Sequence, residues 1–269
     1  MKRYSLFFCD IDGTLLDDHH RIDDETKAKI KAVTDSGIGF ILVSSRVPVS
    51  VIPIADALGI RMPIICAGGG LILDEDRSIL FEAAIEKSTA IAVKALTQKN
   101  WPQVSCHIYS RHLWIVDSLS EESTRLEKII TGAVATEGDP DKLLEEGAPV
   151  HKMLVRGDTA TLEEIYGVIK KTFPQLHPSF SHNHCLEFMH SSAKKSLGIA
   201  FLCRKYGIDP ADTASVGNNH NDIDMLKFTG LGVAMDNAPD AVKKIAGHTT
   251  KSNNDQGVLA LLNKLYPDI

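Results

Sequence analysis

The chain of 269 residues is 43% hydrophobic and 24% charged, with a formal net charge of −6. This hydrophobic content supports a sizeable core and excludes a disordered chain, and the length suits one elaborated domain or two. The 29 Lys and Arg residues are dispersed rather than clustered, which argues against a nucleic-acid-binding surface.

Neither membrane insertion nor secretion is expected. No apolar run approaches the ~20 residues of a membrane span, and the N-terminal apolar run ends at Asp10, too early for a signal peptide. The five cysteines lack CxxC spacing, which favours reduced thiols. We therefore expect a cytoplasmic protein, and the sequence leaves both a monomer and a homodimer open.

Short apolar strands alternate with helices at both ends of the chain. Alternation at this pitch predicts a doubly wound α/β sheet with parallel strands. The predicted elements of the first part are strands at residues 5–9, 39–43 and 63–66, a helix from 23 or 24 to 36, and a helix opened by Pro48. Those of the last part are helices at 194–206, 221–229, from 239 and about 255–265, and strands at 213–216 and 231–234.

The middle of the chain has a different character. Its predicted elements are helices near 86–98, 120–131 and 160–172, and strands at 105–108, 113–116, 152–155, near 180 and near 186. Helices against a largely antiparallel sheet form an α+β arrangement. We therefore predict a core made of residues 1–83 and 189–269, with an α+β domain of residues 84–188 inserted into it.

The first predicted strand ends in two acids, within LFFCDIDGTLL at residues 6–16. In parallel α/β sheets the carboxyl ends of the strands meet at one edge, where ligands bind. Asp10 and Asp12 lie at such an end, and they point the same way if the strand geometry continues that far. Other polar residues reach the same edge from neighbouring strands and a helix start: Ser44, Ser45, GNNHND at 217–222, Lys194 and Lys195.

Carboxylates placed this close together cannot all stay ionised at low cost. Either one acid is protonated or a divalent cation lies among them. Carboxylate, carbonyl and amide oxygens completed by water suit Mg²⁺. A cation beside a carboxylate, with Lys and Ser donors nearby, indicates a phosphate-handling site.

These motifs resemble, in order, those of the haloacid dehalogenase (HAD) superfamily of phosphohydrolases. DIDGTLL resembles its first motif DxDGT, VSSR at 43–46 the second, and SAKKSLGIAFLCRKYGI the third, which supplies a lysine. SVGNNHNDIDMLKFTGLGVAMDNAPDAVK, followed by KSNNDQGV, resembles the fourth motif and tail of the Cof-like branch. That branch contains sugar-phosphate and cofactor-phosphate phosphatases with a large α+β (C2-type) cap, and the resemblance covers the whole chain.

The resemblance implies a role for each matched residue. Asp10 is the expected nucleophile that forms an aspartyl-phosphate, and Asp12 the expected general acid and base. Ser44 and Lys195 would stabilise the transferred phosphoryl group, completing the catalytic set. The implied phosphate-binding residues are Gly13, Thr14, Ser44, Ser45, Lys195 and Asn221. The implied Mg²⁺ ligands are Asp10, Asp12 through its carbonyl, Asn218 and Asp222.

Two positions depart from the family pattern. The fourth motif usually begins Gly-Asp, and that Asp binds Mg²⁺ directly, whereas this chain has Asn218. An amide oxygen brings no charge, so either Mg²⁺ binds more weakly or the protein has become a phosphate-ligand-binding protein with impaired catalysis. Gly68 replaces an Asn that is common after the third strand, and three successive glycines there predict a more mobile loop.

The inserted domain offers candidate substrate contacts. A cap that closes over the crevice would exclude water and select the leaving group. The candidates are Tyr109, Arg111, His182 and His184.

The sequence thus predicts an Mg²⁺-dependent phosphatase that hydrolyses small phosphorylated metabolites, such as sugar phosphates, through an aspartyl-phosphate. A phosphosugar mutase of the same fold is the first alternative, and the impaired binding protein is the second. The particular phosphate ester is left open.

Overall fold

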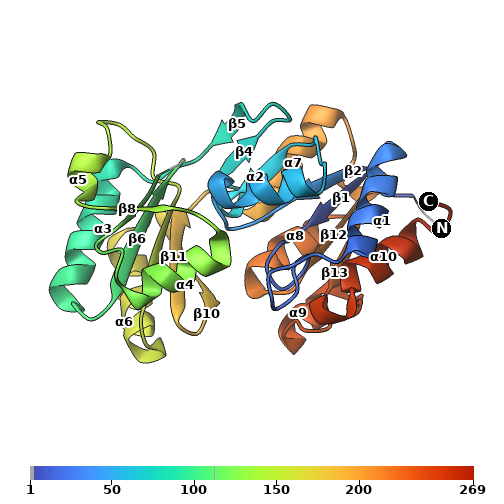
Figure 1. Ribbon diagram of the computed structural model, residues 1–269. Helices are drawn as coiled ribbons and strands as arrows, with labels where there is room; N and C mark the ends of the chain where they lie inside the picture. Colours follow the sequence, from blue (N-terminus) through green and yellow to red (C-terminus); the bar gives the residue numbers. More distant parts are fainter. Residues whose placement is uncertain (1–2, 112) are drawn as a thin grey trace. The chain divides into compact units, whose positions relative to one another are not determined.

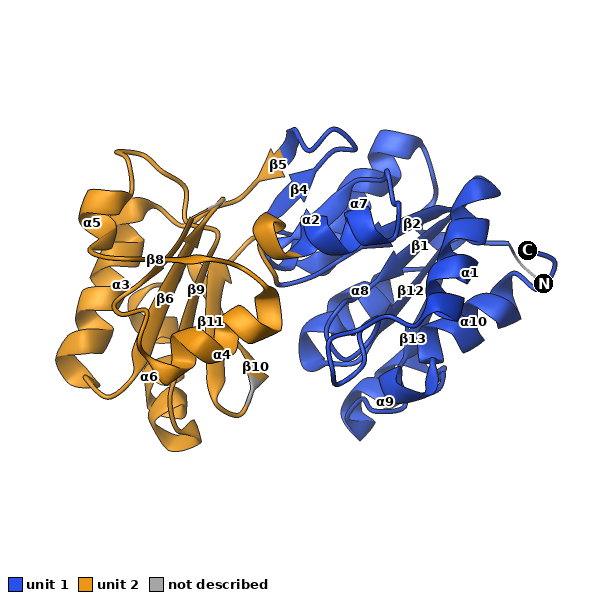
Figure 2. Cartoon of the chain, viewed as in Figure 1, with its two compact units in different colours: residues 1–45, 51–80, 194–269 blue, residues 46–50, 81–193 orange. Residues whose placement is uncertain are grey.

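The structure, a computed structural model, describes residues 3–111 and 113–269, and for His182 the backbone alone. It separates into two compact units (Figure 2). Unit 1 comprises residues 1–45, 51–80 and 194–269, and unit 2 comprises residues 46–50 and 81–193. The boundaries of unit 2 differ by a few residues from the expected 84 and 188, and the segment 46–50 was not anticipated.

Unit 1 contains a parallel sheet with the strand order β13-β12-β1-β2 (Figure 1). Its elements are β1 (Leu6–Cys9), α1 (Asp24–Asp35), β2 (Gly39–Leu42), α2 (Pro48–Ala57), β3 (Ile64–Cys66), η1 (Ala67–Gly69), β4 (Leu71–Leu73), α7 (Lys195–Tyr206), η2 (Pro210–Asp212), β12 (Thr213–Gly217), η3 (His220–Asp222), α8 (Ile223–Phe228), β13 (Leu231–Ala234), α9 (Asp240–Ala246), η4 (Asn253–Asp255) and α10 (Gly257–Leu265). The first residues of α2 belong to unit 2, and β5 (Ile79–Glu82) crosses from unit 1 into unit 2.

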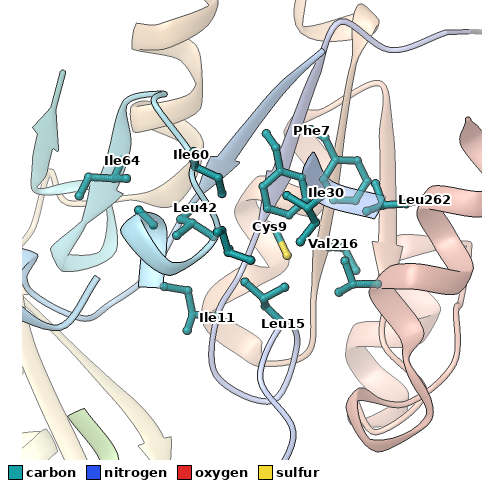
Figure 3. Close-up of a cluster of buried hydrophobic side chains, with 14 of the residues drawn as sticks. Phe7, Cys9, Ile11, Leu15, Ile30, Leu42, Ile60, Ile64, Val216 and Leu262 are labelled. Atoms are coloured by element: carbon teal, nitrogen blue, oxygen red, sulfur yellow. The ribbon is translucent and has the colours of Figure 1, made fainter. Parts of the chain in front are cut away.

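The central strand β1 is buried along its whole length. A strand covered on both faces reads as a continuous apolar run, which is why LFFC has no polar alternation. Phe7 and Cys9 gather with Ile30 of α1, Val216 of β12 and Leu262 of α10 in the core of unit 1 (Figure 3). Because side chains alternate along a strand, Leu6 and Phe8 face the opposite side of the sheet and are buried there. Unit 1 is therefore a doubly wound α/β domain.

The parallel register brings the carboxyl ends of β1, β2 and β12 together. Cys9 pairs with Leu42 on one side and with Val216 on the other. The next residue continues one ladder, because the Asp10 N–H donates to the Val216 carbonyl at 3.1 Å. The loops after these three strands therefore leave from one edge of the sheet.

Unit 2 is an α+β domain with the strand order β10-β11-β9-β6-β7-β8. All neighbouring strands are antiparallel except β7 and β8, which are parallel. Its elements are α3 (Lys87–Asn100), β6 (Ser105–Ser110), β7 (Leu113–Val116), α4 (Glu122–Thr131), β8 (Ala135–Glu137), α5 (Pro140–Leu143), β9 (Lys152–Arg156), α6 (Thr159–Thr172), β10 (Leu176–His182) and β11 (Cys185–His190).

The two faces of the unit 2 sheet differ in chemistry. One face packs apolar side chains such as Ile108 and Val155 against α3 and α6. The opposite face carries Tyr109 and Trp114, together with charged side chains that are also buried. Strand alternation separates the two sets.

Among the described strands and α-helices, four were not predicted from the sequence: β4, β5, β8 and α5. Each has only three or four residues, and β8 (Ala-Thr-Glu) has no apolar pattern, so periodicity could not identify them. No helix within the described residues is both long enough and apolar enough to cross a membrane.

Candidate active site

Asp10 directly follows β1 and is almost completely buried, and its backbone N–H still bonds to β12. Strand β1 ends at Cys9, so regular strand geometry does not extend to Asp12. The condition under which Asp10 and Asp12 would point the same way is therefore not met. After Asp10 the chain forms a turn, in which the N–H groups of Thr14, Leu15 and Leu16 all donate hydrogen bonds to the Ile11 carbonyl. Asp12 lies half-buried within this turn, near enough to Asp10 for its charge to raise the pKa of Asp10.

Lys195 joins the ends of two strands. It is the first residue of α7 and is buried, and its Nζ donates to Asp10 Oδ1 at 2.6 Å and to Asp222 Oδ1 at 2.5 Å. Its neighbour Lys194 is exposed. The structure therefore brings the third-motif lysine between two carboxylates that are distant in the sequence.

Asp222 is fixed from both sides. Its Oδ2 accepts hydrogen bonds from the backbone N–H groups of Asn218 at 2.9 Å and Asn219 at 2.8 Å, which leaves Oδ1 to Lys195. Asn219 and Asp222 together form a capping box for the short helix η3. Gly217 is required here, because a Cβ at this position would lie 2.6 Å from the Asp222 carboxyl carbon.

Ser44 and Ser45 extend the site from the end of β2. Ser44 is buried, and its backbone is held by the Ile65 carbonyl and the Gly68 N–H, at 2.9 Å each. The Ser45 hydroxyl accepts a hydrogen bond from Asn221 Nδ2 at 3.2 Å. Hydroxyls from the second motif and an amide from the fourth thus lie together.

The glycine loop after β3 is buried and closely packed, and the mobility expected from its composition stays a prediction. Gly68, Gly69 and Gly70 are all buried. Gly69 has φ +97°, and a Cβ there would overlap the carbonyl of Lys194. The glycines therefore let the backbone approach the start of α7, which carries Lys195.

Asn218 lies against the turn after Asp10. Its Oδ1 accepts a hydrogen bond from the Thr14 hydroxyl at 3.0 Å. Gly13 has φ +69°, and a Cβ at this position would overlap the Asn218 amide. The structure thus brings Gly13, Thr14 and Asn218 together.

Two supporting residues were missed by sequence reasoning. Asn237 Nδ2 donates to the Gly13 carbonyl at 2.8 Å, and Asp224 Oδ2 accepts from the Ser196 N–H at 2.8 Å. Both fall within the segment that resembles the fourth motif. Their position in this segment was the only sequence signal. The contacts themselves join residues that are distant in the sequence, so they could not be predicted from it.

The site carries more negative than positive charge. Burial and then the Asp222 carboxylate raise the pKa of Asp10 to about 7, although Lys195 opposes them. Burial alone would lower the pKa of Lys195, but Asp10 and Asp222 raise it above its usual value. One ammonium thus lies between two buried carboxylates, with Asp12 beside them.

This donor set fits Mg²⁺. Asp10 and Asp222 offer carboxylate oxygens, Asp12 a backbone carbonyl and Asn218 an amide oxygen, all of them hard ligands. The excess negative charge favours a cation. Among the described residues no group of three or more His, Cys, Asp or Glu side chains forms a metal cluster, so any ion here would also rely on amide, carbonyl and water oxygens.

The four candidate substrate contacts of unit 2 have different environments. Tyr109 is 1% exposed, its hydroxyl donates to Glu127 at 3.2 Å, and its ring stacks on Trp114, so its side chain packs the interior and does not face a solute. Arg111 is partly exposed and its guanidinium binds Glu82. His184 is exposed, with Nδ1 3.3 Å from the Gly157 carbonyl. The side chain of His182 lies outside the described residues.

Comparisons with known proteins agree with these motifs. The sequence pattern of the haloacid dehalogenase-like hydrolases matches residues 7–262. A protein of Haemophilus influenzae named "Putative phosphatase" is 30% identical over 265 residues, covering 98% of this chain and 99% of that protein.

Solved structures show the same fold. A haloacid dehalogenase-like hydrolase from Bacteroides thetaiotaomicron gives a TM-score of 0.90 at 23% identity, covering 98% of this chain and 100% of that one. The HAD subclass IIB sugar phosphatase BT4131 gives 0.83 at 22% identity, covering 98% and 99%. The chain therefore belongs to the family of haloacid dehalogenase-like hydrolases.

Proposed function

We propose that this phosphatase hydrolyses small phosphorylated metabolites, with Mg²⁺ as cofactor, through an aspartyl-phosphate on Asp10. The observation that carries the proposal is the position of Lys195 Nζ, 2.6 Å from Asp10 and 2.5 Å from Asp222 at the carboxyl ends of β1 and β12. This contact uses Asp10 Oδ1 and leaves Oδ2 as the attacking oxygen.

In the first step, Asp10 Oδ2 attacks phosphorus and the bond to the ester oxygen breaks. Lys195 and Ser44 stabilise the negative charge on the transferred phosphoryl group. The Asp12 carboxyl gives its proton to the departing oxygen, which leaves as an alcohol. Asp12 follows the proposed nucleophile by two residues in the sequence and lies in the turn around the Ile11 carbonyl.

In the second step, Asp12 acts in the opposite sense. Now ionised, it takes a proton from a water molecule, which attacks phosphorus and breaks the bond to Asp10. Inorganic phosphate leaves, Asp10 is regenerated, and Asp12 is again protonated. Two easier steps thus replace one difficult displacement.

The Mg²⁺ would be held by Asp10, the Asp12 carbonyl, Asn218 and Asp222, with water completing its shell. When bound, it supplies positive charge that offsets the repulsion between the carboxylates and the phosphoryl oxygens. Sugar phosphates are the first substrates to examine, because the solved sugar phosphatase BT4131 has the same fold.

The test is steady phosphate release from a generic aryl phosphate, with Mg²⁺ and with EDTA. We expect Asp10→Asn to lower the rate by about 10⁴-fold or more, as loss of a covalent nucleophile does elsewhere. Asp24→Asn, which changes an exposed acid of α1, is the matched control and should retain the rate. Equal activity of Asp10→Asn and wild type would refute the proposed nucleophile, and full activity in EDTA would refute the cofactor.

Asn218 favours a second candidate, a phosphate-ligand-binding protein with impaired catalysis. The uncharged Asn218 oxygen already accepts the Thr14 hydroxyl, so it competes poorly as a metal ligand. This candidate predicts that phosphate esters bind, as measured by calorimetry, but are not hydrolysed by wild type at any Mg²⁺ concentration. Measuring both binding and hydrolysis of a panel of phosphorylated metabolites distinguishes the phosphatase from the binding protein.

A further inference from the structure

Unit 1 contains a groove of about 520 Å³ that is separate from the aspartate site. It lies between β13, the edge strand of the parallel sheet, and helix α10. Figure 1 shows both elements near the C-terminal end of the chain. We call it the β13–α10 groove. Leu231, Val233, Leu261 and Leu265 form its apolar walls, and the exposed Lys251 and Lys264 lie at its rim. Asp236, His248, Thr249 and Thr250 also line it.

The walls suit an apolar ligand. Of the four apolar wall residues, Val233 and Leu261 are nearly completely buried, whereas Leu231 and Leu265 are half-buried. Ala260 faces the groove from α10, and its short side chain leaves space there. The volume is within the range of small-molecule sites, which are mostly apolar with a few polar groups.

The rim is positively charged in a chain whose net charge is −6. Lys251 and Lys264 are exposed, and neither has an acidic side chain within 4 Å among residues 3–111 and 113–269. Asp236 also lines the groove, but Lys243 Nζ lies 3.0 Å from its carboxylate. Two cationic groups therefore remain available beside an apolar hollow.

We infer that the β13–α10 groove is a second ligand site, which takes a small organic anion with an apolar body, such as a medium-chain carboxylate. The apolar part is removed from water against the leucine and valine side chains. The carboxylate lies between Lys251 and Lys264 at the rim, where opposite charges attract. This ligand differs in kind from a phosphate ester, because its apolar body is the part that the leucine and valine side chains remove from water.

The experiment is isothermal titration calorimetry of the full chain with octanoate, and with 1-octanol as the uncharged comparison. We expect saturable binding of octanoate at one site, tighter than that of octanol. Lys251→Glu/Lys264→Glu should weaken octanoate binding by about tenfold and leave octanol binding unchanged, since only the rim charge is reversed. Lys244→Glu, an exposed lysine of α9 outside the groove, should bind octanoate as wild type does.

A second variant tests the location. Ala260→Trp fills the groove and should abolish binding of both compounds, while thermal unfolding without ligand shows that the variant is folded. The inference is overturned if wild type shows no saturable octanoate binding. It is also overturned if the double charge reversal leaves octanoate affinity unchanged, or if folded Ala260→Trp still binds octanoate.

Discussion

Both units bury a network of charged side chains, but the two networks differ in balance. In unit 1, Lys195 is the single cation between Asp10 and Asp222. In unit 2, Arg156 pairs with Glu127 at 2.7 Å, and Lys152 pairs with Glu187 at 3.2 Å, so two cations meet two acids. The first network is located where loops leave a parallel sheet, and the second in the middle of antiparallel strands.

The pKa directions follow this balance. Burial and Asp222 raise the pKa of Asp10, and one lysine does not offset them. Burial would also raise the pKa of Glu127, but Lys152 and Arg156 together hold it below its usual value. In a balanced network each buried charge is neutralised by a partner, which favours the folded state. In an unbalanced network the excess carboxylate charge can bind a cation, and a carboxylate oxygen can act as a nucleophile.

The most severe disruption of the unit 1 network is Lys195→Met. The substitution keeps an unbranched side chain but leaves two buried carboxylates without their ammonium. We expect kcat for an aryl phosphate to fall by roughly 10³-fold or more, because the charge that stabilises the transferred phosphoryl group is lost. Steady-state phosphate release measures the change.

The adjacent lysine supplies the control. Lys194→Met alters an exposed residue at the same helix start and should change kcat less than about twofold. An equal loss of kcat in both variants would mean that the two lysines matter equally. The contacts of Lys195 with the carboxylates would then have no special role.

The balanced network is tested by Glu127→Gln, which removes one charge at nearly constant volume. Arg156 and Lys152 then face a single acid, and uncompensated buried charge is costly. We expect the free energy of unfolding to fall by roughly 3–5 kcal/mol, measured by urea denaturation. Glu122→Gln, on the exposed side of the same helix, should cost less than about 1 kcal/mol. Similar losses in the two variants would contradict a role for charge balance.

The close approach of the Gly217 backbone to the Asp222 side chain is tested by Gly217→Ala. The new Cβ would lie 2.6 Å from the Asp222 carboxyl carbon, so the carboxylate or the backbone around it must shift. We expect kcat to fall about 10- to 100-fold, the usual cost of a small displacement in an active site. Gly167→Ala in α6 has open space around it and should leave kcat unchanged. An unaltered kcat in Gly217→Ala would show that Asp222 tolerates displacement.

Sequence reasoning identified Asp10 and Asp222, because polar residues directly after strands are visible in a linear pattern, whereas Lys195 was assigned from the resemblance of its helix start to the third motif. Asp10, Ser44 and GNNHND each interrupt or follow an apolar run. Parallel register then brings strand ends together by geometry alone. The particular partners, such as the two N–H groups on Asp222, depend on the local turn and could not be read in this way.

The balanced network was not predicted, for a physical reason. Lys152 and Arg156 lie at the two ends of β9, on either side of the apolar run Met-Leu-Val, and charged residues at such positions are usually exposed. Here Tyr109 and helix α4, which carries Glu127, lie against these two side chains, so the charges are buried. Tyr109, a candidate substrate contact, likewise packs its ring inside the unit, against Trp114.

The mildest change adds charge to the unbalanced network. Asn218→Asp supplies a carboxylate beside Asp10 and Asp222, at a half-buried position. We expect the Mg²⁺ concentration at half-maximal activity to fall by about three- to tenfold, since a charged oxygen competes better with water. Without Mg²⁺ the variant should unfold at a lower temperature than wild type, because a further like charge is added. With saturating Mg²⁺ it should gain more thermal stability than wild type, because the ion binds the folded state more tightly. A variant that requires as much Mg²⁺ as wild type, and gains no more stability from it, would remove residue 218 from the metal ligands and leave Asp10, Asp12 and Asp222 to hold the ion.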